Sequence, residues 1–132
     1  MNNSGQTVSL LTNYYKLPST DLIVVHDDLD LVLGRIKVRL GGAAAGHHGV
    51  ESIIKELGTD QFIRIRLGIG NEKTQLGEHK KSGKLGFNAE RFVVEEFTSK
   101  EHSPVKHMIK RAIEALEMIL KDGLDSAQNQ FN

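Results

Sequence analysis

The short apolar run at residues 22–25, Leu-Ile-Val-Val, constrains the fold more than any other feature of the sequence. A continuous run of this length is typical of a strand buried on both faces, as in α/β sheets. Two further segments, residues 34–40 and 62–70, alternate apolar with basic residues. Alternation with a period of two indicates strands that have one buried face. Together the three segments predict a β-sheet.

A helix is predicted near the start of the chain. Ser4 is a residue type that caps helices, and Val8, Leu11 and Tyr15 recur along one face of the segment that follows. Pro18 then ends the helical pattern. We therefore expect a helix from Ser4 through about Tyr15, with these apolar side chains on its apolar face.

Two more helices follow from the same periodicity. Residues 50–57 carry apolar side chains at i, i+3, i+4 and i+7, and a glycine ends the pattern. Residues 103–122 predict a longer helix that begins with a Ser-Pro pair and ends at Gly123. The polar, glycine-containing segment 71–88 predicts a loop. The element order predicts an α/β protein with a mixed β-sheet covered by helices.

The composition narrows the class of protein. With 132 residues and no internal repeat or linker, the chain is expected to form a single domain, 1–132. The absence of cysteine excludes disulfides, thiolate metal sites and a cysteine nucleophile, and it fits a reducing cytoplasm. A formal net charge of zero argues against a strongly basic, non-specific nucleic-acid binder but allows a local basic patch. No membrane span or signal peptide is expected from the apolar runs.

Acidic residues directly follow the first apolar run. Asp27 is expected just past the strand, at the carboxyl end, where ligands gather in open α/β sheets. A carboxylate there can orient a histidine and stabilise its imidazolium. Spacing alone favours a simpler interpretation, in which Asp27, Asp28 and Asp30 form a solvated acidic turn. A metal site built from His26, Asp27 and Asp30 would have no diagnostic ligand spacing, so no metal is expected.

The small-residue segment 41–49 connects the second strand to the second helix. It lacks the features of a P-loop or a dinucleotide fingerprint. Small residues let a ligand approach the backbone closely, and the amides at a helix start can bind an anion or a carbonyl. His47 and His48 lie at that helix start. The alternative is a tight strand-to-helix connection with exposed histidines.

Basic residues recur on the two alternating strands. One strand has Arg35, Lys37 and Arg39 on the same face, and the other is expected to point Arg64 and Arg66 outward. If the strands lie near each other, these side chains form one cationic patch suited to phosphate. The alternative is that they are ordinary solvent-facing positions.

Four stretches carry motifs in a fixed order. They are MNNSG at residues 1–5, VHDDLDL at 25–31, RLGG and GHHG between 39 and 49, and RIRLGIG at 64–70. They resemble the patterns M-N-x-S-G, V-x-H-D-[ED]-L-D-L, K-x-G-G-x-x-x-G-H-N-G and R-x-R-[IL]-G-[IV]-G of the bacterial-type peptidyl-tRNA hydrolase family. Each motif alone is weak, but four in register are strong, and the likeness continues to the tail at residues 130–132.

The resemblance implies an enzyme that hydrolyses the ester bond between peptide and tRNA without a cofactor. Asp27 matches the aspartate that orients the catalytic histidine of the family. Asn2 matches the asparagine that helps to place the peptide and the catalytic water. The resemblance also implies a cytoplasmic protein, typically monomeric, whose partner is peptidyl-tRNA and which uses neither a metal nor a membrane.

The same resemblance assigns substrate contacts. His47 matches the histidine on the rim of the active-site crevice. His48 stands where the family has asparagine, a residue that hydrogen-bonds the substrate. Arg39 and Arg66 match the basic pair that clamps the tRNA 5′ phosphate, and Arg39 replaces the more usual lysine.

Two family motifs do not occur in the sequence. They are the G-x-G-N-P-G loop after the family's first strand and the R-H-N-x-G segment that carries the catalytic histidine. The sequence therefore resembles the C-terminal portion of the family domain without its first strand or strands, as expected of a fragment or a truncated gene model. His47 is the nearest substitute for the missing base, but substitution is not expected. The alternatives are a non-catalytic tRNA- or RNA-binding remnant, a relative of the splicing factors that share this fold, or a decayed gene product.

Overall fold

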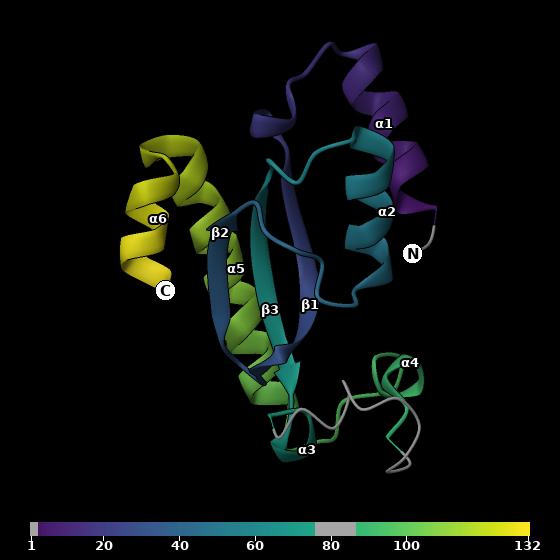
Figure 1. Ribbon diagram of the computed structural model, residues 1–132. Coiled ribbons are helices and arrows are strands. Elements are labelled where there is room, and N and C mark those ends of the chain that lie inside the picture. The colour runs from purple at the N-terminus through teal and green to yellow at the C-terminus, as the bar shows by residue number, and fades with distance from the viewer. Residues whose placement is uncertain (1–2, 76–86) are drawn as a thin grey trace.

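In a computed structural model of the chain, residues 3–75 and 87–132 are described, and they form three strands with helices on both sides (Figure 1). The strands are β1 (Ile23–Val32), β2 (Ile36–Leu40) and β3 (Ile63–Gly70). The helices are α1 (Ser4–Tyr14), the 3-10 helix η1 (Ser19–Asp21), α2 (His48–Leu57), α3 (Glu72–Gln75), α4 (Ala89–Phe92), α5 (His102–Asp122) and α6 (Leu124–Phe131).

The sheet is mixed, as the element order predicted. Its strand order is β1-β3-β2, with β1 parallel and β2 antiparallel to the central strand β3. The first strand is longer than its apolar run suggested, because it continues through the acidic residues to Val32. The placement of Asp27 just past the strand is therefore wrong. Asp27 lies inside β1, next to an irregularity in pairing between Asp28 and Val32.

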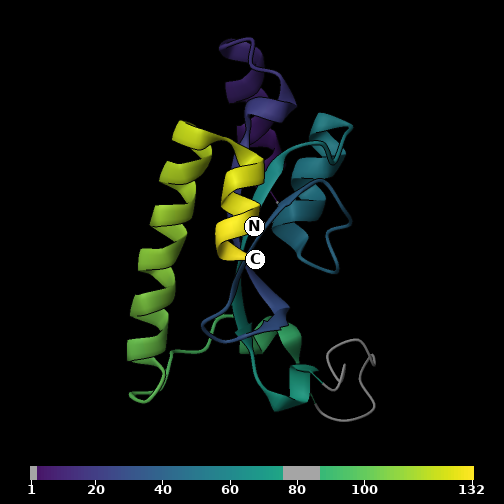
Figure 2. The ribbon, with the colours of Figure 1, turned by 90° about the vertical axis from the view of Figure 1, so that its left-hand side faces the viewer.

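The two faces of the sheet are covered by different helices. On one face, α5 and α6 pack against β2 and β3, while α2 lies on the other face and α1 packs beside α2 (Figures 1 and 2). The larger buried cluster joins the strands to α5 and α6; its members are Ile36, Val38, Ile63, Ile65, Met108, Ala112, Ala115, Ile119, Ala127 and Phe131. The smaller cluster, on the α2 side, consists of Val50, Ile53 and Phe62. The sheet thus has one broad apolar face and one face with little apolar cover.

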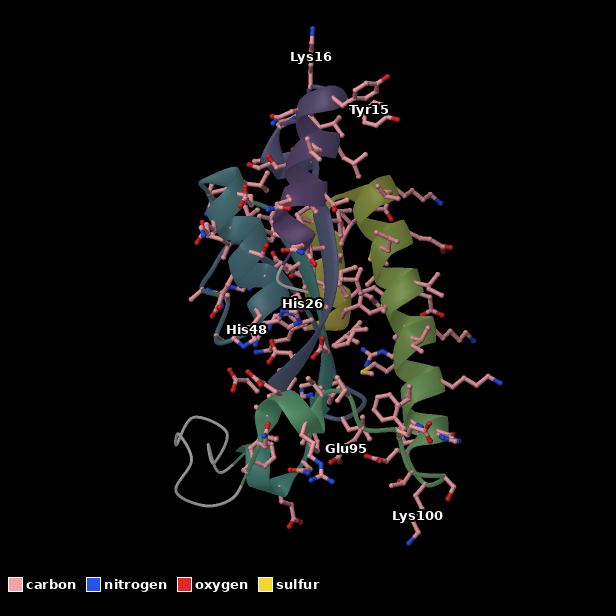
Figure 3. The ribbon with its side chains drawn as sticks, turned by 90° about the vertical axis from the view of Figure 1, so that its right-hand side faces the viewer. Tyr15, Lys16, His26, His48, Glu95 and Lys100 are labelled. Carbon is pink, nitrogen blue, oxygen red and sulfur yellow. The ribbon has the colours of Figure 1, made fainter. Side chains whose placement is uncertain are left out.

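Helix α1 differs from its sequence-based prediction in its cap and in its buried face. Its N-cap is Asn3 rather than Ser4, and Asn3 makes no side-chain capping bond. The buried residues of α1 are Gly5 and Thr12, whereas Tyr15, just beyond the helix, projects from its far end (Figure 3). A β-carbon on Gly5 would overlap the Ser52 carbonyl of α2. Close contact between the two helices, which periodicity does not encode, therefore decides which face of α1 is buried.

The remaining helices were predicted with mixed success. Helix α2 ends at Gly58, which has the left-handed conformation that suits glycine, and α5 ends at Gly123, as predicted. The loop expected over 71–88 contains the short helix α3, and its residues 76–86 lie outside the described part of the chain. Helix α6 was not predicted at all. It brings the terminal side chain of Asn132 against the outer edge of β2, where the amide bonds the N–H of Val38 at 2.7 Å and its carbonyl at 2.9 Å.

Candidate functional site

Asp27, predicted to orient a histidine, and His47, predicted to lie on the crevice rim, are in direct contact. His47 Nε2 lies 3.0 Å from Asp27 Oδ1, and the side chains are 16% and 36% exposed. The contact joins β1 to the start of α2 across 20 residues of sequence. It forms because the segment 41–46 reverses the chain between β2 and α2 with residues of positive φ, including Ala45 and three glycines.

The hydrogen bonds of His47 define its proton position. His47 is the N-cap of α2, and its Nδ1 accepts the backbone N–H of Val50 at 3.1 Å. In the neutral ring the proton must then sit on Nε2, which donates to Asp27 Oδ1. Both ring nitrogens are therefore engaged. His47 is suited to hold Asp27 in place rather than to accept a proton from water.

Asp27 is held in its charged form. The hydrogen bond from His47 lowers the pKa of the Asp27 carboxyl below its ordinary value, although burial acts in the opposite direction. An ionised carboxylate that is still partly exposed can accept a hydrogen bond from a second donor, such as the imidazole N–H of another histidine. This arrangement suits an orienting carboxylate.

His26 supports the same pair from inside the protein. Its ring packs edge-on against His47, with centroids 4.9 Å apart. Its Nδ1 lies 2.7 Å from the backbone carbonyl of Asp27. Burial lowers the pKa of His26, so that the neutral ring is favoured. In Figure 3, His26 lies between β1 and α2, while His48 lies further out.

A pocket of about 930 Å³ opens in front of Asp27 and His47. One wall is the acidic stretch 27–30 of β1, and another is the small-residue segment 44–46. The third wall comes from far along the chain, from α4 and the apolar residues Val93 and Val94 that follow it. Sequence reasoning missed this third wall, because no pattern in a short polar helix indicates that it folds back over a strand 60 residues away.

His48 lies at the mouth of the pocket. Its side chain is 52% exposed, with Nδ1 at 3.3 Å from Glu51 and Nε2 at 3.7 Å from Glu90 of α4. The alternative of a tight strand-to-helix connection with exposed histidines therefore holds for His48. It does not hold for His47, which is mostly buried. Asn2 lies outside the described residues, whereas its neighbour Asn3 lines the pocket.

The predicted patch of cations on the two strands is wrong for Arg64. This residue is 2% exposed, and its guanidinium donates to the carbonyls of Gly41 at 2.7 Å and Ala43 at 3.1 Å. Burial, followed by repulsion from Arg39 and Arg66, lowers its pKa. β3 is the central strand and is covered on both faces, so the outward position that alternation predicted does not exist. Arg64 anchors the segment 41–46 instead.

Arg39 and Arg66 lie on the same face of the sheet. Arg39 is paired with Arg64 in the β2–β3 register, and Arg66 follows two residues later along β3. Arg39 is exposed, and its guanidinium lies so close to Gly42 that a β-carbon there would overlap it. Arg66 has only a 15% exposed side chain and bonds Asp28 at 2.6 Å. No local sequence pattern indicates this ion pair, because it depends on the parallel pairing of β1 with β3.

No group of three or more His, Cys, Asp or Glu side chains in residues 3–75 and 87–132 is placed to hold a metal ion. Within the same residues, no helix is both long and apolar enough to cross a membrane.

Comparison with known proteins gives a consistent result. A family model described as peptidyl-tRNA hydrolase matches residues 1–132. A peptidyl-tRNA hydrolase of Dehalococcoides mccartyi is 42% identical over the whole chain, which covers 66% of that protein, and one of Mycobacterium leprae is 43% identical, with 61% covered. A crystal structure of a peptidyl-tRNA hydrolase in complex with n-propanol superposes on the chain with a TM-score of 0.83 at 27% identity. The chain covers 61% of that structure, and thus spans about three fifths of the proteins it matches.

Proposed function

The chain belongs to the peptidyl-tRNA hydrolase family, and from this premise we propose that the protein hydrolyses the ester bond between peptide and tRNA, releasing free tRNA for translation. The observation that carries the proposal is the Asp27–His47 hydrogen bond at the wall of a pocket of about 930 Å³. The chain supplies this site as a single domain that corresponds to the C-terminal portion of the family's domain.

In this proposal Asp27 orients the histidine that activates water, which the family carries on the R-H-N-x-G segment that does not occur in residues 1–132. The carboxylate is charged, and His47 holds one of its oxygens. An imidazole that donates one N–H to Asp27 keeps its other nitrogen free to take a proton from the attacking water. Asn2 helps to place the peptide and the water, and His47 borders the crevice without acting as the base.

The pocket is proposed to hold the peptide end of the substrate. Its apolar wall, which includes Val93, can contact side chains, while polar groups at its mouth can hydrogen-bond the peptide backbone. His48 occupies the position of the substrate-binding asparagine, but its two nitrogens already face Glu51 and Glu90. Binding of the peptide at His48 therefore competes with these carboxylates.

The tRNA phosphate is proposed to bind at Arg39 and Arg66. Arg39 is exposed and has no strong ion pair among the described residues, so it can offer its planar fork to a phosphate. Arg66 is partly neutralised by Asp28, which makes its contribution the smaller one. The clamp is thus asymmetric, with Arg39 as the main contact.

Hydrolysis of a peptidyl-tRNA by the chain joined to the family's R-H-N-x-G segment, and by the Asp27→Asn variant of that protein, tests the catalytic proposal. The variant should lose about 10²–10⁴-fold in kcat while tRNA binding is retained. Asp21→Asn, which alters an exposed aspartate of η1, is the matched control and should behave as the wild type. If the wild-type chain binds tRNA but releases no peptide, the function of this chain is binding and not hydrolysis.

The clamp is tested by tRNA binding across a range of salt concentrations. Arg39→Ala should weaken binding and reduce the slope of log K against log salt by about one unit. Lys110→Ala, on the exposed side of α5, is the control for a general loss of positive charge. Equal salt slopes for the two variants would show that Arg39 does not contact the tRNA phosphate.

A further inference from the structure

Two buried polar atoms on the α2 face of the sheet have no hydrogen-bond partner among the described residues. They are Nε2 of His26 and Nε of Arg64. The two residues are 8% and 2% exposed, so bulk water does not reach these atoms. Buried polar groups in folded proteins nearly always have a partner, and leaving one without a partner costs free energy. A pair of such atoms in one region therefore needs an explanation.

The two atoms have complementary hydrogen-bonding roles. His26 Nδ1 faces the carbonyl oxygen of Asp27 at 2.7 Å, so the ring proton sits on Nδ1 and donates to that oxygen. Nε2 is then a lone pair that can only accept. Arg64 Nε always carries a proton and can only donate. One atom needs a donor and the other needs an acceptor.

The strand register places the two side chains close together. In the parallel β1–β3 pair, Val24 is opposite Arg64 and His26 is opposite Arg66, so His26 and Arg64 are diagonal neighbours. Both side chains therefore project from the same face of the sheet, two residues apart along neighbouring strands. The charge of Arg64 also acts on His26, as one of the effects that lower the pKa of the histidine. The remaining guanidinium nitrogens of Arg64 are occupied by the carbonyls of Gly41 and Ala43.

We propose that His26 and Arg64 form an internal binding site for a single water molecule, which accepts from Arg64 Nε and donates to His26 Nε2. A buried water commonly satisfies such groups with two to four hydrogen bonds. The water links β1 to the anchor of the segment 41–46. Because the His26 ring stacks on His47, the site supports the ring that holds Asp27. His26 is then a positioning residue, which touches neither substrate nor water in the pocket.

A crystal structure of the chain at a resolution that reveals ordered water tests the site. We expect one water within hydrogen-bond distance of both His26 Nε2 and Arg64 Nε. The His26→Phe variant keeps an aromatic ring against His47 but removes the acceptor, and it should lose this water. A direct bond between the two side chains, or the absence of density between them in the wild type, would refute the proposal.

Side-chain NMR in solution provides an independent test. In the wild type, Arg64 Nε–H should exchange slowly and show a cross-relaxation signal with a long-lived water, and His47 Nε2–H should give a sharp resonance. Both signals should be lost or broadened in His26→Phe and unchanged in His107→Phe, which alters an exposed histidine of α5. Unchanged signals in His26→Phe would refute the supporting role. Neither measurement requires hydrolysis, so the outcome is separate from that of the proposed function.

Discussion

The two faces of the sheet use the same strands but are held by different forces. On the α5–α6 face, Ile65 and its neighbours form a wholly apolar cluster. On the α2 face, the same central strand buries Arg64 and half-buries Arg66, and both are held by hydrogen bonds to oxygen. Only the second face carries the pocket and the Asp27–His47 pair. The apolar face stabilises the fold, and the polar face holds groups that must stay charged or oriented.

The difference shows how a small sheet can support a chemical site. Burial of apolar side chains is non-directional and gives most of the stability of a fold. Buried hydrogen bonds add less net stability, but they fix positions, and they cost free energy when one partner is removed. We therefore expect substitutions on the apolar face to lower stability strongly. Substitutions on the polar face should have smaller and more local effects.

The largest effect is expected from Ile65→Ala. Ile65 is fully buried in the central strand, so its truncation should lower the free energy of unfolding by about 2–5 kcal/mol. Chemical denaturation followed by circular dichroism measures this change. Ile113→Ala in α5, where the side chain is 52% exposed, should change stability by no more than about 0.5 kcal/mol. Similar losses in the two variants would mean that the α5 face is not the main source of stability.

A smaller effect is expected from Arg64→Met on the polar face. The variant leaves the carbonyls of Gly41 and Ala43 without their donor, which should cost about 1–3 kcal/mol of unfolding free energy. Hydrogen exchange should show that the opening is concentrated in the amides of the segment 41–49. A variant more stable than the wild type would instead show that desolvation of the buried guanidinium outweighs its hydrogen bonds.

The smallest expected effect is the pH dependence of stability that arises from His26. Because burial lowers its pKa in the folded chain, the unfolded chain binds more protons below pH 6.5, and stability should fall as the pH drops from 6.5 through the folded pKa. The slope from one such group is at most about 1.4 kcal/mol per pH unit. Denaturation at several pH values should show a flatter profile for His26→Phe than for His107→Phe. Parallel profiles would contradict a neutral, buried His26.

Asp27 contributes in a lower pH window. Its pKa is lowered by His47, so the stability that it adds is present above its ordinary value of 3.8 and is lost as the pH falls through the folded pKa. On acidification, the stability change due to His26 therefore begins at a higher pH than the change due to Asp27.

Local patterns predicted several parts of the structure correctly. The alternation at 34–40 and 62–70 marked β2 and β3, and the periodicity at 103–122 marked α5 with its end at Gly123. The family motifs named both Asp27 and His47, which the structure places in contact, while their roles in a site stay a prediction. These features depend on neighbours in sequence or on motifs, both of which can be read without a fold.

Other parts depended on contacts that no local pattern contains. Alternation placed Arg64 outward, but β3 lies between two strands and under the segment 41–46, so the guanidinium is buried. Helix α1 buries Gly5, because α2 approaches it at that residue. His26 reaches His47 only because α2 packs over β1.

The amino-acid sequence predicted most of the strand and helix segments, the α/β class, and the residue types available for chemistry, because these follow from periodicity and from the properties of single side chains. Which face of each element is covered, and which groups become partners, depends on tertiary packing. Strand pairing and helix packing join residues far apart in sequence, as in Arg66 with Asp28 and Asp27 with His47, and burial then sets their charge state. The sequence identifies these side chains, but the distances between them are set by the fold.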